Sequence, residues 1–224
     1  VEDVAAEHFD ANSVGVIDET TFVKKGDQTA GVQHQYCGAV GKQENCVMSV
    51  HLSYATPDGF HCMLDGELYL PEANWHEDRE RCRKAGIPDD YVYRAKWQMA
   101  LDQHARAVAN GVRMAWLTFD EAYSRVGELR RTLESRGQNY VAEVPSDFAV
   151  WTQRPDVLYR DHARDKKMSG NKRRPAGLRL KIKNNPRGEV RNVLKYSPIM
   201  RGEPWVAYRV KDGAKGPMVW EAKQ

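Results

Sequence analysis

The sequence contains no long apolar run. No stretch of its 224 residues approaches the ~20 consecutive apolar residues that a membrane-spanning helix requires. Hydrophobic residues make up 41% and charged residues 29% of the chain, which is an ordinary globular composition. We therefore expect no membrane partner. The length allows one large domain, or a domain with a further subdomain.

Familiar metal and nucleophile motifs are missing as well. Four widely spaced cysteines form no C-x-x-C pair, which argues against a zinc knuckle and favours reduced thiols in a cytoplasmic protein. The seven histidines show no H-x-x-x-H or H-E-x-x-H spacing. No G-x-S-x-G, phosphate-loop or dinucleotide glycine motif occurs. The chemistry of the chain must therefore rest on other residues.

The charge of the chain is divided unevenly between its two parts. Residues 146–224 carry 19 Lys and Arg against 8 Asp and Glu, whereas residues 1–145 carry 15 against 23. The net charges are thus +11 and −8, although the whole chain carries only +3. A basic segment of this kind suits a polyanion such as nucleic acid, and the alternative is a solvated basic surface.

Apolar patterns in the first 145 residues predict an α/β fold. Strands are expected at residues 13–22, 46–54, 61–71, 112–124 and 139–145. Helices are expected at residues 72–86, 93–111 and 127–138. The first three strands should form an antiparallel meander. The order β-β-β-α-β-α-β is typical of a mixed sheet with helices packed on it.

The pattern changes after Pro145. A polar, basic loop at residues 164–177 precedes the strictly alternating stretch "LRLKIKNN" at 178–185, which predicts a strand with a cationic face. Residues 189–198 and 204–212 are further strand candidates. We expect residues 1–145 to form one domain and residues 146–224 to form a basic, β-rich insertion.

Two predicted strands end on acids in the same way. "VIDE" ends at Asp18 and Glu19, and "TFDE" ends at Asp120 and Glu121. If the two strands are neighbours, Asp18 and Asp120 meet at one edge of the sheet. Carboxylate oxygens suit Mg²⁺ or Mn²⁺, and such ions support phosphodiester cleavage. The alternative is that each acid caps a turn or a helix.

Three segments of the sequence resemble DDE-type insertion-sequence transposases, a group also described as DDE superfamily endonucleases. They are residues 16–56, 68–90 and 117–145. Matching positions in the first segment include Asp18, Thr21, Lys24, Lys25 and Gly26. Further matches are Trp75, Asp78, Arg79 and Gly86 in the second segment, and Asp120, Tyr123, Gly137 and Pro145 in the third.

The resemblance implies a ribonuclease-H-like fold with Asp18 and Asp120 as the first two catalytic acids. It also implies Mg²⁺ or Mn²⁺, transposon ends and target DNA as partners, a homodimer on DNA and a location at the bacterial nucleoid. The third acid of the family is a Glu on a helix after the insertion. No segment here matches that helix, so we expect the third acid beyond Gln224.

Basic residues near the acids and in the insertion are the expected DNA contacts. Lys24 and Lys25 follow the first strand and would hold phosphate, unless they simply form a solvated turn. The insertion would follow the DNA backbone through Lys166, Lys167, Lys172, Arg173 and Arg174.

Competing interpretations remain open on the sequence alone. Glu19 stands where the family commonly has Asp, and Ser124 stands where Gly is usual. These departures favour a decayed transposase that binds DNA without cutting it. The retained aspartates favour an enzyme that cleaves DNA and transfers the strand, and an unrelated nuclease of the same fold is a third interpretation.

Overall fold

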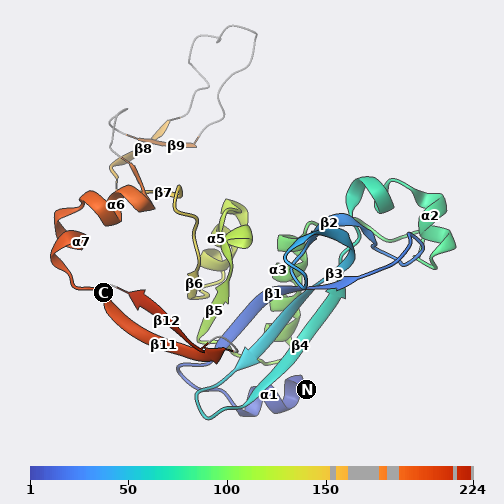
Figure 1. Cartoon of the computed structure of the whole chain (residues 1–224), viewed down its shortest axis with the longest axis horizontal. Coiled ribbons are helices and arrows are strands. Elements are labelled where there is room, and N and C mark those ends of the chain that lie inside the picture. The colour runs from blue at the N-terminus through green and yellow to red at the C-terminus, as the bar shows by residue number, and fades with distance from the viewer. Residues whose placement is uncertain (152–154, 161–176, 181–186, 214–215, 223–224) are drawn as a thin grey trace, which may run out of the picture. The chain divides into compact units, whose positions relative to one another are not determined.

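The structure is a computed structural model that describes residues 1–151, 155–160, 177–180, 187–213 and 216–222 (Figure 1). The chain forms two compact units, Val1–Val144 and Pro145–Gln224. No helix among these residues has both the length and the apolar character needed to cross a bilayer.

A mixed sheet forms the centre of the first unit. Its strands are β1 (Val14–Val23), β2 (Gln33–Cys37), β3 (Lys42–Ala55), β4 (His61–Leu68), β5 (Trp116–Phe119) and β6 (Tyr140–Ala142). The strand order is β2-β3-β1-β5-β6, and β4 also pairs with β3. The pairs within β1–β4 are antiparallel, while β1, β5 and β6 run parallel. The fold is thus mixed α/β, consistent with a ribonuclease-H-like arrangement.

Strand β2 is an addition to the predicted order. No strand is expected at residues 33–37, because glycines at 31, 38 and 41 interrupt this region. In the structure β2 pairs with Lys42–Cys46, the first part of the 14-residue strand β3. Strand β2 therefore forms because its backbone pairs with the long strand β3, although its own side-chain pattern does not predict a strand.

Short and long helices precede, separate and follow the strands of the first unit. They are α1 (Glu2–Glu7), the π-helical turn η1 (Glu72–His76), α2 (Arg79–Lys84), α3 (Lys96–Ala109), α4 (Glu121–Ser124) and α5 (Gly127–Ser135). The single helix predicted at 72–86 is wrong: Asp78 accepts a hydrogen bond from the Arg81 N–H at 3.0 Å and starts α2 as a separate helix. Helix α3 ends as predicted before Gly111, whose φ of 88° suits glycine.

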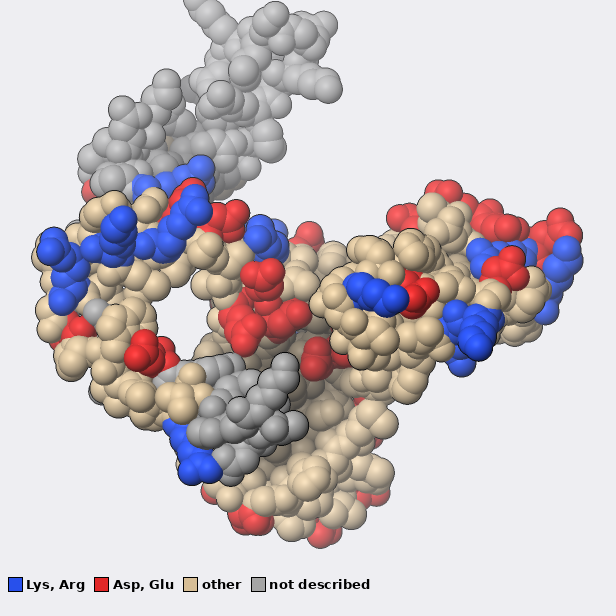
Figure 2. All heavy atoms as spheres, viewed as in Figure 1, with Lys and Arg blue, Asp and Glu red and all other residues tan. Residues whose placement is uncertain are grey.

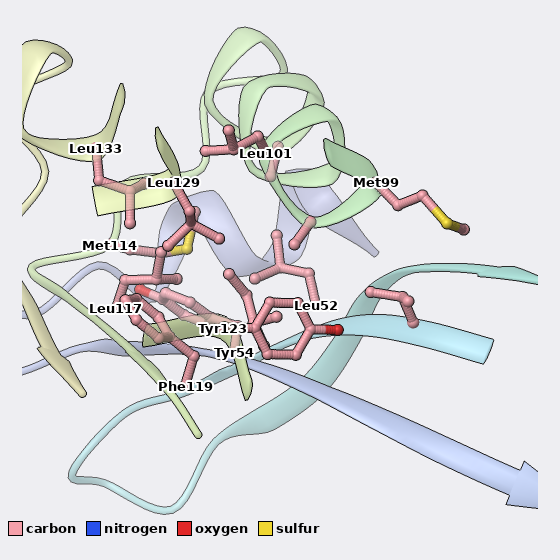
Figure 3. Packing of buried hydrophobic residues seen from close by; sticks show 14 of the residues in the cluster. Leu52, Tyr54, Met99, Leu101, Met114, Leu117, Phe119, Tyr123, Leu129 and Leu133 are labelled. Atoms are coloured by element: carbon pink, nitrogen blue, oxygen red, sulfur yellow. The ribbon is translucent and has the colours of Figure 1, made fainter. Parts of the chain in front are cut away.

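The main core lies between α3, α5 and one face of the sheet. Leu52 of β3, Leu117 of β5 and Leu129 of α5 are fully buried there, and Figure 3 shows them among the packed side chains. Ile17 belongs to the same core and lies opposite Leu52 and Phe119 on the neighbouring strands. Because side chains alternate along a strand, the residues beside Ile17 point to the other face.

A smaller core forms beside η1 and α2. Its centre is Trp75, whose indole N–H donates a 2.9 Å hydrogen bond to the carbonyl of Val32. Arg81 lies 4.0 Å above the Trp75 ring and also donates to the carbonyls of Asn74 and Asp27. These contacts fix η1 and α2 against the β2–β3 end of the sheet.

The second unit contains short strands and two helices. They are β7 (Ala149–Val150), β8 (Val157–Arg160), β9 (Gly177–Leu180), β10 (Gly188–Glu189), α6 (Val190–Tyr196), α7 (Pro198–Gly202), β11 (Val206–Gly213) and β12 (Gly216–Ala222). The strand predicted at 204–212 is confirmed by β11, which pairs with β12. The strand predicted at 189–198 is wrong, because Val190, Val193 and Ser197 are partly buried at helical spacing in and just after α6. Of the predicted strand 178–185, residues 178–180 lie in β9 and the other five residues lie outside the described residues.

Candidate active site at the ends of β1 and β5

The register of two parallel strands brings Asp18 and Asp120 together. Ile17 of β1 lies opposite Phe119 of β5, and each aspartate is the next residue of its chain segment. Neighbouring strands are about 4.8 Å apart, so the two aspartate backbones lie about one strand spacing from each other. Both side chains line one pocket of about 590 Å³.

Each aspartate uses one oxygen for a local backbone contact. Oδ1 of Asp18 accepts a 2.7 Å hydrogen bond from the N–H of Glu19. Oδ1 of Asp120 accepts from the N–H groups of Ala122 and Tyr123 at 2.9 and 3.3 Å. Among the described residues, no hydrogen bond or ion pair engages Oδ2 of either carboxylate.

Asp120 is therefore the N-cap of α4, which begins at Glu121. This capping role is the alternative raised from the sequence. A cap needs only one acceptor oxygen, so it orients the carboxylate without occupying its second oxygen. Capping and cation binding are compatible at this position.

Glu19 points to the other face of β1. Its carboxylate lies 2.8 Å from Nζ of Lys96, the first residue of α3. Burial, reinforced by the negative charges of Glu19, Asp120 and Asp18, raises the pKa of the Tyr123 hydroxyl well above its usual value. Glu19, Lys96 and Tyr123 thus form a partly buried cluster of polar side chains close to the two aspartates.

Lys96 is the residue near the carboxylates that the sequence analysis missed. It lines the 590 Å³ pocket and also an adjoining pocket of about 210 Å³ with Tyr69, Tyr93 and Trp97. A signal was present in the sequence, because a lysine at the first turn of a helix opposes the helix dipole unless an acid compensates it. The identity of that acid, Glu19, required the structure.

The expected DNA contacts lie away from the aspartates or outside the described residues. Lys24 follows the last residue of β1, six residues beyond Asp18, so at about 3.3 Å per residue the two backbones are about 20 Å apart. Lys25 lies in the bend that follows. The five basic positions predicted in the insertion, at 166, 167, 172, 173 and 174, lie outside the described residues.

Charge is distributed over both units of the chain. In Figure 2, acidic side chains gather over α5 and the adjoining part of the sheet, and basic side chains lie over α6 and α7. Arg191, Lys195 and Arg201 belong to those two helices. The described part of the second unit thus carries basic side chains on its surface.

The donor set at the pocket suits a divalent cation that keeps other ligands. Mg²⁺ is commonly held by one or two carboxylates, with waters and substrate phosphates completing its coordination. Asp18 and Asp120 supply two carboxylates with open oxygens. In the described part of the chain, no group of three or more His, Cys, Asp or Glu side chains is placed to hold a metal. The residues therefore fit a site in which two carboxylates bind the cation and water or substrate phosphate supplies its other ligands.

A mixed sheet with carboxylates just beyond the paired segment of two adjacent parallel strands is the arrangement expected of a ribonuclease-H-like nuclease. The profile of the DDE superfamily endonuclease family matches residues 2–217, and the chain belongs to this family. The family consists of transposase-like nucleases, which act on DNA and generally depend on a divalent metal. Neither curated proteins nor solved structures give a match to the chain.

Proposed function

We propose that the chain is the metal-dependent DNA-cleaving part of an insertion-sequence transposase, with Asp18 and Asp120 holding the cation. The observation that supports this most directly is the register of β1 and β5, in which Asp18 and Asp120 each follow one member of the pair Ile17 and Phe119. Membership of the endonuclease family supports DNA cleavage as the reaction. The Oδ2 atoms of the two aspartates are available as ligands for a cation. On this proposal residues 1–145 form the catalytic core and residues 146–224 hold DNA.

Mg²⁺ or Mn²⁺ bound by the two aspartates would supply a Lewis acid for the oxygens of the scissile phosphate. The chain's own residues set where that phosphate lies. The Asp18 carboxylate is oriented by the Glu19 N–H, and the Asp120 carboxylate by the first turn of α4. Lys96 carries a positive charge in the same pocket and balances the negative charge that gathers there.

The overall reaction is a pair of in-line displacements at phosphorus. Water attacks the phosphodiester at the element's end, a phosphorus–oxygen bond forms as the bond to the 3′-oxygen breaks, and one proton passes from the water to that oxygen, which leaves as a 3′-hydroxyl. That 3′-hydroxyl then attacks a target phosphodiester, and the target's own 3′-oxygen leaves with the proton that the attacking hydroxyl gives up. Both steps use the same carboxylate pair. A homodimer on DNA and a nucleoid location belong to this proposal.

Basic residues would supply the contacts to the DNA backbone. Lys24 and Lys25 lie beyond the end of β1, and Lys166, Lys167, Lys172, Arg173 and Arg174 are concentrated in a short part of the second unit. Such contacts fix the position of a duplex without reading its sequence. They also make affinity depend on salt.

The test is cleavage of supercoiled plasmid by the full-length protein in Mn²⁺. The wild type should nick the plasmid, Asp18→Ala and Asp120→Ala should not, and Glu121→Ala should nick normally because Glu121 is an exposed neighbour of Asp120. Nicking by Asp120→Ala at the wild-type rate would remove the proposed site. DNA binding without any nicking by the wild type would instead identify a protein that holds DNA and does not cut it.

A further inference from the structure

The face of β1 that carries Asp18 continues as a regular row of exposed side chains. Because side chains alternate along a strand, Thr20 and Phe22 point to the same face as Asp18, opposite to buried Ile17 and Thr21. Phe22 is 56% exposed, which is unusual for a phenylalanine in a central strand. Successive members of this row are about 6.6 Å apart along the strand.

Lys24 extends the row by one further step. Its N–H donates a 2.8 Å hydrogen bond to the carbonyl of Asn45, which continues the β1–β3 pairing beyond Val23. The Asn45 side-chain amide donates to the carbonyls of Lys24 and Gly26 at 3.3 and 2.5 Å. The backbone that carries the Lys24 ammonium is therefore fixed, and within the described residues no carboxylate pairs with it.

Beyond Ile17, one edge of β1 has no strand partner among the described residues. Strand β5 pairs with β1 only as far as Ile17, and beyond that point the described partner of β1 is β3 on its other edge. The 590 Å³ pocket begins at the carboxylates and includes Thr20 and Thr21. It is also lined by Gly38 and Ala39 of the β2–β3 turn, where the Ala39 N–H donates to the Thr21 hydroxyl at 3.1 Å. A chain-like ligand bound at Asp18 can thus extend along β1 toward Lys24 without displacing a strand.

We propose that β1 is a track for one strand of the DNA substrate, a conclusion that rests on the nuclease function proposed above. The scissile phosphate lies at Asp18, and the Thr20 hydroxyl donates to a neighbouring phosphate. The Phe22 ring packs against a sugar or base, and the Lys24 ammonium pairs with a more distant phosphate. Lys25 lies in the bend after the strand and is outside this row.

The length of the row sets the distance between the contacted phosphates. Asp18 and Lys24 are about 20 Å apart along β1. If each row member meets one nucleotide of the strand, at a spacing of about 6.6 Å, Thr20 contacts the phosphate next to the cut and Lys24 contacts a phosphate about three nucleotides from it. Lys24 therefore contacts a phosphate that is not next to the cut.

The test is a scan with single uncharged methylphosphonates in a duplex that spans a cleavage position mapped beforehand with the wild-type protein in Mn²⁺. Binding of the full-length protein is measured by fluorescence anisotropy in Ca²⁺. The wild type should lose affinity when the phosphate at the Lys24 contact is neutralised. Lys24→Gln should bind unmodified DNA more weakly, with a salt slope reduced by about 1, and should no longer respond at that position. Lys84→Gln is the control, because Lys84 pairs with Glu80 on α2 and lies outside this row, and it should keep the wild-type pattern.

A second variant tests the near end of the track. Thr20→Val keeps the shape of the side chain and removes the hydroxyl, so sensitivity at the phosphate next to the cut should fall while the Lys24 position is unchanged. If the wild type cuts and Lys24→Gln retains the complete methylphosphonate pattern, the track is wrong and the nuclease function stands. If the wild type produces no metal-dependent cut to map, both proposals are wrong.

Discussion

Glu19 and Lys96 form an ion pair on the face of β1 opposite to Asp18, with 2.8 Å between a carboxylate oxygen and Nζ. The two side chains are only 19% and 33% exposed. The pair joins the residue after Asp18 to the first residue of α3, so it connects the end of β1 to the helix that covers the sheet. The ion pair gives Glu19 a structural role. Glu19 is therefore not needed among the groups that would hold a cation.

Replacing Glu19 should reduce stability more than a surface substitution does. Glu19→Gln leaves the Lys96 ammonium partly buried without its charge partner, and we expect a loss of about 1–2 kcal/mol, between the values for exposed and buried pairs. Urea unfolding followed by circular dichroism measures this change. Glu121→Gln, on an exposed position, is the control and should unfold like the wild type. Equal stability of the two variants would show that the ion pair contributes nothing.

Asp120 combines two roles that different substitutions separate. Asp120→Asn keeps an acceptor oxygen for the N–H groups of α4 but lacks the charge that a divalent cation requires, whereas Asp120→Ala loses both. We expect both variants to lose cleavage, and only Asp120→Ala to lose about 1 kcal/mol of unfolding free energy. Plasmid nicking and urea unfolding of the same samples provide the two measurements. An asparagine variant that nicks like the wild type would leave capping as the only role of Asp120.

The second unit should make DNA binding strongly dependent on salt. Each phosphate contact contributes about −0.9 to the slope of log K against log salt on duplex DNA. Replacing Lys166, Lys167 and Lys172 together by Gln should therefore make the slope less steep by up to about 3. Lys84→Gln is a suitable control, because Lys84 lies in the first unit and pairs with Glu80. Affinity that is constant between low and moderate salt would contradict the assignment.

Local patterns in the sequence predict the strands on which the two candidate aspartates depend. The segments before Asp18 and Asp120 are apolar and form parts of β1 and β5, and the periodicity of α3 is strong, so these elements were found. Polar strand β2 and the division of 72–86 into η1 and α2 were not found, since one depends on pairing with distant β3 and the other on the Asp78 cap. The Glu19–Lys96 pair spans 77 residues, and no local pattern encodes such a contact.

The buried His104 should make stability depend on pH. Burial, together with the charge of Arg136, lowers the pKa of His104 below its usual 6.5, although a hydrogen bond with Gln138 opposes this. The unfolded chain therefore binds a proton near pH 6.5 that the folded protein takes up only at lower pH. The unfolding free energy should then fall as the pH drops below about 6.5. Urea unfolding at pH 7.5 and 5.5 should show a smaller decrease for His104→Gln than for the wild type, because the variant lacks the titrating group. His34→Gln, at an exposed position of β2, should keep the wild-type decrease, and identical behaviour of all three proteins would contradict the role of His104.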